Sequence, residues 1–580
     1  MGTTGSKAAR LVLLGVTAAV AGTFAAAAAV SSGTGSARAA EAARRPNVVV
    51  VMTDDQTVES LRVMTNVRRL LSDQGTTFTN NFATFSLCCP STATFLTGQY
   101  AHNHGVLGNA PPAGGYNKLD STNTLPVWLR RAGYHTVHIG KYLNGYDRSD
   151  GVPPGWSEWY GSIDPTTYRF WNYTLNENGR FVTYGGRPEN YQGDVYTRKA
   201  VDAVRRLAPA QEPFFLSIAY LAPHSGGPRT PGDPQGIATP EPAPRHRNAF
   251  DSEPMPRPPS LNEADVSDKP VGIRSRPLLT AAQLGAIEEN YQQRLESLLA
   301  VDEGVAQLVD ALRAAGELDE TIILFTSDNG FFHGEHRVPS GKVLLYEPSI
   351  RVPLIIRGPG IARGRRVAEL AGNIDLAPTI ADAANARPGR RMDGRSVLPL
   401  ARSGQARWGR DILIENGPGL ARRRARVQAF AAIRTPRYLY AEYGNGDREL
   451  YDLARDPHEL DSRHADPAYT AARAELARRL ARLRRCAAAE CRRGPRLSLS
   501  VRGAAARRCV ARVAVVGADA RWLTRVDVTV AGRPVAVDRR SPFARSVRWR
   551  PRRGRVALGA RAYLADGRVA SLARSVRSCS

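Results

Sequence analysis

Short runs of apolar residues recur along the first two thirds of the chain, between stretches in which apolar residues return every three or four positions. The run at 47–52 is continuous and rich in valine, which is typical of a strand buried on both faces of a parallel sheet. Similar runs lie at 136–139, 214–219, 321–325 and 352–356, with helical periodicity between them at 124–131, 194–206 and 280–315. This alternation predicts an α/β fold with a central, mostly parallel sheet flanked by helices.

The last third of the chain changes character. A β-rich pattern at 426–452 and a helical pattern at 467–485, with leucines on one side, predict a small α+β subdomain. Beyond Cys491, short alternating segments such as 526–530 and 556–563 are broken by glycine, proline and Arg-Arg, and they predict a small β-sandwich. The expected segments are a signal peptide at 1–39, a main α/β domain at 45–385, its α+β subdomain at 386–486 and the sandwich at 495–580.

The N-terminus has the form of an export signal. Lys7 and Arg10 precede an apolar run at 11–30, and Ala37-Arg38-Ala39 has the small-x-small form of a cleavage site. The run is also long enough for an uncleaved anchor, but the site that follows it favours cleavage. We therefore expect a secreted, extracellular protein, either free or associated with the cell surface, with no membrane segment after cleavage.

The formal charge of +26 is concentrated at the C-terminal end, where residues 486–580 contain 22 arginines, no lysine and five acidic residues. Such a segment favours polyanionic partners, among them an anionic cell-wall polymer or a sulfated glycan. The alternative is that arginine is the default surface charge of this Ala- and Arg-rich chain, because charge alone carries no specificity. For the same reason we expect no specific binding of nucleic acid.

The cysteines fall into two groups. Cys88 and Cys89 are adjacent, whereas the other four lie in the last hundred residues. Four clustered cysteines in an exported protein predict two disulfides, and three pairings are open. We favour Cys486–Cys491, which closes a short loop, together with Cys509–Cys579, which would tie the first and last strands of the small domain.

Acidic residues directly follow two of the predicted strands. Asp54 and Asp55 come after the first strand, and Asp328 and Asn329 come after the strand at 321–325. Parallel sheets bind ligands beyond the carboxyl ends of their strands, so these side chains could converge there. Three carboxylates and an amide oxygen make a hard cage that suits calcium or magnesium better than zinc. Taken singly, each pair would be an ordinary turn.

The run Leu87-Cys88-Cys89-Pro90-Ser91-Thr92-Ala93 is the most distinctive motif of the chain. It resembles the sulfatase signature Cys-x-Pro-x-Arg, in which the first cysteine is oxidised to formylglycine (3-oxoalanine) and becomes the nucleophile. Further motifs in the family's order extend the resemblance over about 46–486, closest to the branch of N-acetylglucosamine-6-sulfatase and the extracellular endosulfatases. They include Thr53-Asp54-Asp55-Gln56, Thr97-Gly98-Gln99-Tyr100, Gly140-Lys141-Tyr142-Leu143-Asn144, Ala222-Pro223-His224, Ser327-Asp328-Asn329-Gly330 and Gly341-Lys342. The resemblance implies an alkaline-phosphatase-like fold and a sulfuric ester hydrolase.

The resemblance also implies roles for single residues. Cys88, converted by a formylglycine-generating enzyme and hydrated to a geminal diol, would attack sulfur. The ligands of a divalent cation, calcium or else magnesium, would be Asp54, Asp55, Asp328, Asn329 and the modified Cys88. The sulfate would be surrounded by Lys141, His224 and Lys342, and either His224 or Lys342 would protonate the leaving alcohol. His102 and His104 would contact substrate or fix their own loop.

One position departs from the signature, because Thr92 stands where the family has arginine. Threonine has no charge and cannot present a guanidinium fork. Three outcomes are open: an active sulfatase, an unconverted protein that only binds sulfated glycans, or a hydrolase of another ester such as a phosphoester. The resemblance favours a sulfated sugar such as N-acetylglucosamine-6-sulfate in a glycan as substrate, with an aryl sulfate as the alternative.

Overall fold

The computed structural model describes residues 44–404, 408–417, 428–503, 509–551 and 554–579. The signal peptide expected at 1–39 lies outside these ranges. Within them, no helix combines the length and the apolar composition needed to cross a membrane.

A ten-stranded sheet forms the centre of the α/β domain, in the order β11-β2-β10-β9-β1-β8-β4-β5-β6-β7. Its middle strands are parallel: β9 (Thr321–Ser327), β1 (Asn47–Thr53), β8 (Phe214–Ala219), β4 (His135–Gly140) and β5 (Glu158–Ser162). The outer strands are β11 (Arg365–Val367), β2 (Thr76–Phe78), β10 (Leu354–Arg357), β6 (Tyr173–Glu177) and β7 (Arg180–Tyr184). All seven residues of β1 are buried, as the run of valines predicts.

The centre of the sheet is parallel, as predicted, and antiparallel strands flank it: β10 runs antiparallel to β9 and to β2, and the β5-β6-β7 edge is antiparallel. A strand was predicted at 352–356. The direction of the strand found there, β10, follows from the segment that connects it to β9. A parallel neighbour needs a crossover past one face of the sheet, usually by a helix. The segment between β9 and β10 instead stays at the carboxyl edge, where it carries Lys342 and only the four-residue helix α8 (Glu347–Ile350).

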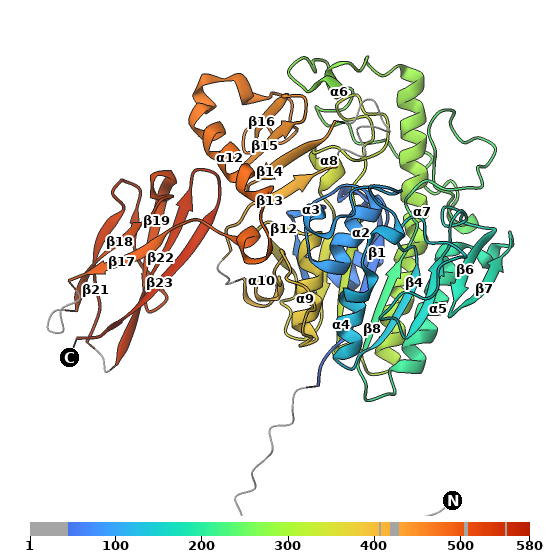
Figure 1. The fold of residues 1–580 in the computed structure, drawn as a ribbon, viewed down its shortest axis with the longest axis horizontal. Coiled ribbons are helices and arrows are strands. Elements are labelled where there is room, and N and C mark those ends of the chain that lie inside the picture. The colour runs from blue at the N-terminus through green and yellow to red at the C-terminus, as the bar shows by residue number, and fades with distance from the viewer. Residues whose placement is uncertain (1–43, 405–407, 418–427, 504–508, 552–553, 580) are drawn as a thin grey trace, which may run out of the picture. The chain divides into compact units, whose positions relative to one another are not determined.

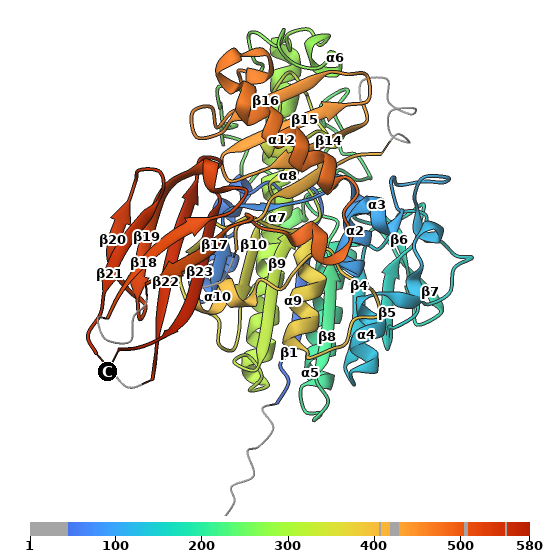
Figure 2. The same ribbon diagram turned by 60° about the vertical axis from the view of Figure 1, so that its left-hand side comes forward.

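Helices cover both faces of this sheet (Figures 1 and 2). Alternate residues of β1 point to opposite sides, so Val48 and Val50 belong to one core and Val49 and Val51 to the other. The first core also receives α2 (Cys88–Thr97), α4 (Leu125–Arg131) and α9 (Leu376–Ala383). The second receives α5 (Gln192–Leu207) and α7 (Ala281–Ala314). A capping box of Thr280 and Gln283 begins α7.

The α+β subdomain is an antiparallel sheet with one helix packed on it. Its strands are β13 (Ile412–Glu415), β14 (Phe430–Arg434), β15 (Tyr438–Tyr443) and β16 (Arg448–Asp452). The leucines expected on one side of the helix, Leu476, Leu480 and Leu483 of α12 (Thr470–Leu483), are buried against Leu413 and Ile433.

Two antiparallel sheets form the C-terminal sandwich. One contains β17 (Ser498–Arg502), β18 (Val510–Val516) and β21 (Ala544–Arg548). The other contains β20 (Arg533–Asp538), β19 (Leu523–Val530), β22 (Arg555–Leu564) and β23 (Val569–Arg577). Inward-facing residues of both sheets share one apolar core. The segment boundaries given above remain predictions.

Both expected disulfides are present. Cys486 pairs with Cys491, and Cys509 pairs with Cys579, with Cα atoms 5.1 Å apart in each bridge. The second bridge joins the residue before β18 to the chain just after β23. Cys88 and Cys89 are free and buried.

Candidate active site

Two adjacent strands of the sheet bring the four predicted cage residues together. The register of β1 and β9 places Thr53 beside Ser327, so the acidic residues that follow each strand emerge at the same edge. The Asp55 N–H donates to Asp328 Oδ1 at 3.0 Å, and Asn329 Nδ2 donates to Asp55 Oδ1 at 2.5 Å. Asp54, Asp55, Asp328 and Asn329 are all buried.

The thiol of Cys88 faces this cage from the first residue of α2. Its Sγ lies 3.7 Å from Asp54 Oδ1 and 2.9 Å from Lys342 Nζ. Ser91, one turn along the helix, fixes α2 to the cage by donating to the Asp328 carbonyl at 2.5 Å. The side chain of Cys89 lies instead in the apolar core under the helix, and burial raises the pKa of its thiol to about 12. The two adjacent cysteines therefore have different environments, and only Cys88 faces charged groups.

Cations close the cage from the loops beyond β4, β8 and β9. Lys141 forms an ion pair with Asp54, and Lys342 forms one with Asp55. His224 Nδ1 donates to the Ser225 carbonyl at 2.6 Å, and this bond holds Nε2 towards the site, 3.6 Å from Asp55 Oδ2. The structure therefore brings Lys141, His224 and Lys342 together around the carboxylates and the thiol.

Burial and mutual attraction set the charge states here. Burial acts to raise the pKa of Asp54, but Lys141, His224 and Lys342 hold that pKa below its usual value. Burial and the negative charge of Asp54 raise the pKa of Asp328 well above normal. Burial opposes the charge on Lys141 and Lys342, yet the neighbouring aspartates outweigh it, and both lysine pKa values lie well above normal.

The donor set fits a hard divalent cation. The Asn329 amide nitrogen is satisfied by Asp55 and by the Gly330 carbonyl, whereas its buried Oδ1 has no hydrogen-bond partner among the described residues. Ligand atoms of Asp54, Asp55, Cys88 and His224 lie within 4.8 Å of one another. Carboxylate and amide oxygens are the ligands that calcium and magnesium prefer.

Arg294, in the middle of α7, was not expected at this site. Its guanidinium donates to the Pro223 carbonyl at 2.8 Å and to the Asp55 carbonyl at 2.5 Å, with its plane 3.9 Å above the Phe331 ring. Asp55 has a left-handed backbone conformation, with φ of 68°. The two hydrogen bonds of the guanidinium therefore hold this strained residue of the cage together with Pro223, the residue before His224. In the sequence this arginine looks like any surface arginine of an amphipathic helix.

Tyr168 was missed as well. Its ring lies 4.7 Å from Lys141 Nζ and 4.8 Å from the His224 ring, and its hydroxyl accepts a hydrogen bond from Asn144 Nδ2 at 2.6 Å. It forms an aromatic wall between two of the cations. No residue pattern around position 168 pointed to this role.

The two histidines after the nucleophile motif face protein rather than the cage. His102 contacts Glu415 through Nδ1 and the Cys486 carbonyl through Nε2, both at 3.0 Å. His104 Nε2 lies 3.0 Å from the Thr94 hydroxyl. Of the two roles open to them, the fixing of a loop agrees with these contacts.

Comparisons with known proteins cover the α/β domain and the α+β subdomain. The sequence model of the sulfatase family matches residues 46–386, and the model of the N-sulphoglucosamine sulphohydrolase C-terminal region matches 334–486. N-acetylglucosamine-6-sulfatase of Capra hircus is 34% identical over 503 residues, which cover 78% of this chain and 86% of that protein. The extracellular sulfatase SULF-1 homolog of Drosophila melanogaster is 34% identical over 402 residues, which cover 66% of this chain but only 35% of that protein.

Among solved structures, one of a protein in complex with its substrate D-glucosamine-2-N,6-O-disulfate aligns with a TM-score of 0.63 at 25% identity. The alignment covers 75% of this chain and 97% of that one.

Proposed function

The chain belongs to the sulfatase family, and we propose that it is a secreted, formylglycine-dependent sulfatase that removes sulfate from a sulfated sugar. Its membership makes it a sulfuric ester hydrolase with an alkaline-phosphatase-like fold. The observation that supports the mechanism is the placement of Cys88, whose thiol lies at the mouth of the carboxylate cage and within contact of Lys342.

The catalytic roles proposed for single residues follow from these positions. Lys141 and Lys342 bind the sulfate oxygens and neutralise the charge that grows on them in the transition state. His224 is better placed than Lys342 to protonate the leaving alcohol, because its Nδ1 bond to Ser225 fixes Nε2 towards the site. Burial lowers the pKa of His224, so the proton that Nε2 gives has to be held there by the negative charges of Asp54 and Asp55. Tyr168 offers an apolar face beside these cations on which a sugar ring could stack.

Asp54, Asp55, Asp328 and Asn329 would hold calcium or magnesium beside Cys88 after its conversion to formylglycine. Such a cation, when bound, lowers the pKa of a hydroxyl next to it and so supplies the nucleophile at neutral pH. The chain's own residues hold the carboxylates in place: Asp328 through the Asp55 and Asn329 amides, and Asp55 through Arg294.

The proposed substrate is a 6-O-sulfated glucosamine in a glycan such as a glycosaminoglycan. It is supported by the similarity to N-acetylglucosamine-6-sulfatase and to the protein solved with D-glucosamine-2-N,6-O-disulfate. Secretion is supported by the N-terminal sequence, the two disulfides and the extracellular relative. The cations around the site would accept an aryl sulfate or a phosphoester as well, so substrate choice needs direct measurement.

Mass spectrometry of the peptide that spans Cys88, from protein secreted by its natural host, tests the proposal. We expect formylglycine at position 88, and faster release of sulfate from N-acetylglucosamine-6-sulfate than from an aryl sulfate. Finding only a thiol, or a Cys88–Cys89 disulfide, would contradict the enzymatic mechanism. Faster hydrolysis of phosphate monoesters than of sulfates would contradict the substrate class.

A second, non-catalytic role is favoured by the outer face of the sheet β17-β18-β21. Arg502 lies directly opposite Arg512, and Arg548 lies diagonally next to Arg512 on the same face. All three are exposed and have no ion-pair partner among the described residues, and no acidic residue lies on these strands. Like charges directly opposite each other destabilise a sheet, so an external anion would relieve this repulsion. We propose that this arginine face, Arg502, Arg512 and Arg548, binds a sulfated glycan or an anionic cell-wall polymer.

A further inference from the structure

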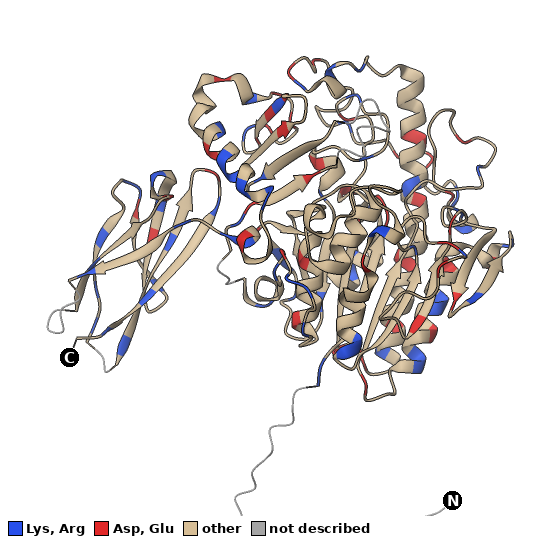
Figure 3. Ribbon diagram, in the orientation of Figure 1, with Lys and Arg blue, Asp and Glu red and all other residues tan. Residues whose placement is uncertain are grey.

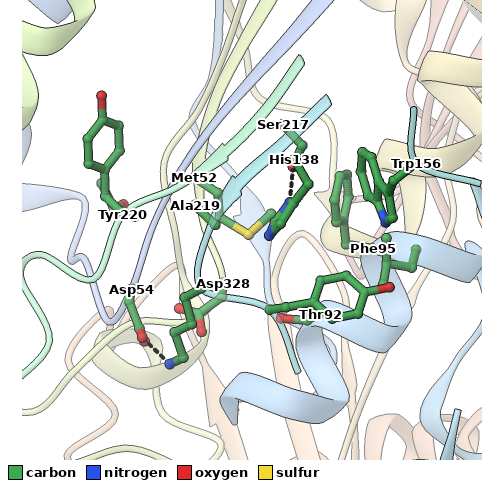
Figure 4. A pocket seen from close by; sticks show the side chains of 14 residues that line it. Met52, Asp54, Thr92, Phe95, His138, Trp156, Ser217, Ala219, Tyr220 and Asp328 are labelled. Atoms are coloured by element: carbon green, nitrogen blue, oxygen red, sulfur yellow. Dashed lines mark hydrogen bonds and ion pairs between the residues drawn. The ribbon is translucent and has the colours of Figure 1, made fainter. Parts of the chain in front are cut away.

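A small cavity adjoins the cage, and side chains of the cage, of α2 and of β4 surround it (Figure 4). Its volume is about 30 Å³. Asp54, Asp328 and Lys141 line one part of it, and Thr92 of α2 and His138 of β4 line another, whereas Cys88, His224 and Lys342 are not among its lining residues. The cavity therefore borders the cage and Lys141 but not the thiol of Cys88.

His138 brings an unsatisfied polar atom to this cavity. Only 3% of the residue is exposed, and its Nε2 has no hydrogen-bond partner among the described residues. Its Nδ1 lies 3.3 Å from the Ser217 hydroxyl, and its ring stacks on Trp159 with 4.7 Å between centroids. Burial lowers the pKa of His138 to about 3 and outweighs the opposite effect of the nearby Gly140 and Lys141 backbone, so the ring is neutral.

The cavity has room for a water molecule and offers it polar partners. A buried water needs roughly 10–15 Å³ of accessible volume and two to four polar partners. The lining supplies such partners in the Thr92 hydroxyl, His138 Nε2 and the carboxylates of Asp54 and Asp328. An empty cavity with this lining would leave the buried imidazole nitrogen without a bond, which is costly.

We propose that this cavity binds one ordered water molecule, which joins His138 and Thr92 to the buried side of the cage. His138 and Thr92 are then positioning residues, because they act on the carboxylates through this water. The inference rests on the proposed function only in taking the cage to be a cation site. It also assigns a role to Thr92, the one position that departs from the family signature.

Because Thr92 and His138 line the same cavity, the size of side chain that fits at one of these positions depends on the residue at the other. An arginine at 92 has several more heavy atoms than threonine, and we expect them to compete for space with the His138 ring, which lines the same cavity and packs against Trp159 and Tyr142. The site therefore accommodates either a long cation from α2 or an imidazole from β4 with a water, but not both.

A high-resolution crystal structure of the full secreted chain gives the direct test. We expect a water within hydrogen-bond distance of His138 Nε2 and of at least one of Thr92 and the cage aspartates. A dry cavity, or a water that touches none of these groups, would overturn the proposal.

Calcium titration of shape-conserving variants tests the effect on the cage. Thr92→Val and His138→Phe remove the water's partners with little change in volume, and each should weaken calcium binding about tenfold, as loss of outer-shell partners does. Because both act through one water, the double variant should be no weaker than the weaker single one. Additive losses, or unchanged affinity, would overturn the proposal. Thr97→Val is the control, because Thr97 is buried on the same helix and its hydroxyl bonds only to the Ala93 carbonyl and the Gln99 amide; it should leave the affinity unchanged.

Unfolding of the metal-free protein tests the dependence between the two positions without any activity. Thr92→Arg should lower the urea midpoint in the natural background and lower it much less when His138 is alanine. An equal loss in both backgrounds would overturn the shared-cavity inference. Neither readout depends on formylglycine, so a chain that keeps its Cys88 thiol would refute the proposed mechanism and still allow this test.

Discussion

The cage at the ends of β1 and β9 and the arginine face of the sandwich both concentrate charge, but in opposite ways. In the cage, aspartates and lysines are buried and paired, as in the contacts of Asp54 with Lys141 and of Asp55 with Lys342. On the arginine face, Arg502, Arg512 and Arg548 are exposed and of one sign. Figure 3 shows more blue than red along the strands of the sandwich. Buried pairs depend on geometry, whereas an exposed array depends mainly on the number of charges and on salt. The two regions should therefore respond to different perturbations.

Replacement of Cys88 should separate the two regions most clearly. Cys88→Ala removes the proposed nucleophile and should lower sulfate release at least about a thousandfold. Cys89→Ala, the matched control, deletes a buried thiol from the core and should cost about 1 kcal/mol of unfolding free energy with activity retained. Retention on a heparin column should be the same for both variants. Residual activity of Cys88→Ala near the natural level would contradict the role of this residue.

Removal of the bound metal should have the next largest effect, a loss of unfolding free energy. At a free calcium concentration of 100 times the dissociation constant, binding adds about 2.7 kcal/mol to stability, and a chelator should remove this gain. The measurement is calorimetric unfolding with and without chelator. Heparin retention of the chelated protein should not change, because the arginine face holds no ligand of the cage. Identical unfolding curves would argue against a cation in the cage.

Replacement of Arg294 tests whether the cage depends on the two hydrogen bonds that this guanidinium donates to backbone carbonyls. Arg294→Met should lower kcat and calcium affinity roughly 10- to 100-fold, the range for loss of an outer-shell partner, while KM changes little. Arg294→Lys should recover only part, because an ammonium cannot bridge two carbonyls as a guanidinium does. Arg313→Met, an exposed change on the same helix, should stay within about 0.5 kcal/mol. A rise in KM alone would assign Arg294 to substrate binding instead.

The arginine face should be the salt-sensitive region. Replacing Arg502, Arg512 and Arg548 with glutamine should weaken heparin binding about tenfold, at roughly 0.5 kcal/mol for each exposed charge pair. The same number of changes at Arg533, Arg574 and Arg577, elsewhere on the sandwich, gives the matched control. Equal losses in the two triple variants would mean that only net charge matters. Activity on a small sulfate ester should remain unchanged in both.

The smallest expected effect is a pH dependence at His102, which joins α3 (Ala101–His104) to the Cys486–Cys491 loop. Burial acts to lower the pKa of His102, but the bond and charge of Glu415 outweigh burial and raise it. A raised pKa means that this stabilisation is present below about pH 6.5, the unfolded value, and is lost as pH rises through the folded value. His102→Gln should therefore reduce the fall in unfolding free energy between pH 6 and pH 9 by about 1 kcal/mol. An unchanged slope would show that His102 is neutral throughout.

The sequence predicted most of the cage because its residues follow strands. Asp54, Asp55, Asp328 and Asn329 each come directly after a buried run, and parallel strands bring their carboxyl ends to one edge. The direction of β10 was not predictable in this way, because direction depends on the path of the connection and not on the strand's own residues. The disulfide pairing was favoured, among the three that were open, because Cys486 and Cys491 close a short loop and leave Cys509 and Cys579 for each other.

Arg294, Tyr168 and His138 could not be predicted, for one shared reason. Each acts by contact with a segment distant in the chain: Arg294 with Asp55, Tyr168 with Lys141 and His224, and His138 with the cavity next to Thr92. Periodicity places a residue on a face, but it does not say which distant loop that face meets. Arg502 and Arg512 are similar, since only the strand register sets them opposite each other.

The deep burial of Cys88 limits the time during which this residue could be modified while the chain is being synthesised. Only 1% of Cys88 is exposed in the folded chain, so the proposed modifying enzyme would have to reach it before the cage closes. Lys342, which contacts the thiol, is 254 residues further along the chain. At a synthesis rate of about 5–20 residues per second, that interval gives the proposed conversion roughly 13 to 50 s before Lys342 has been made. The efficiency of maturation would then depend on the pace of translation as much as on the motif around Cys88.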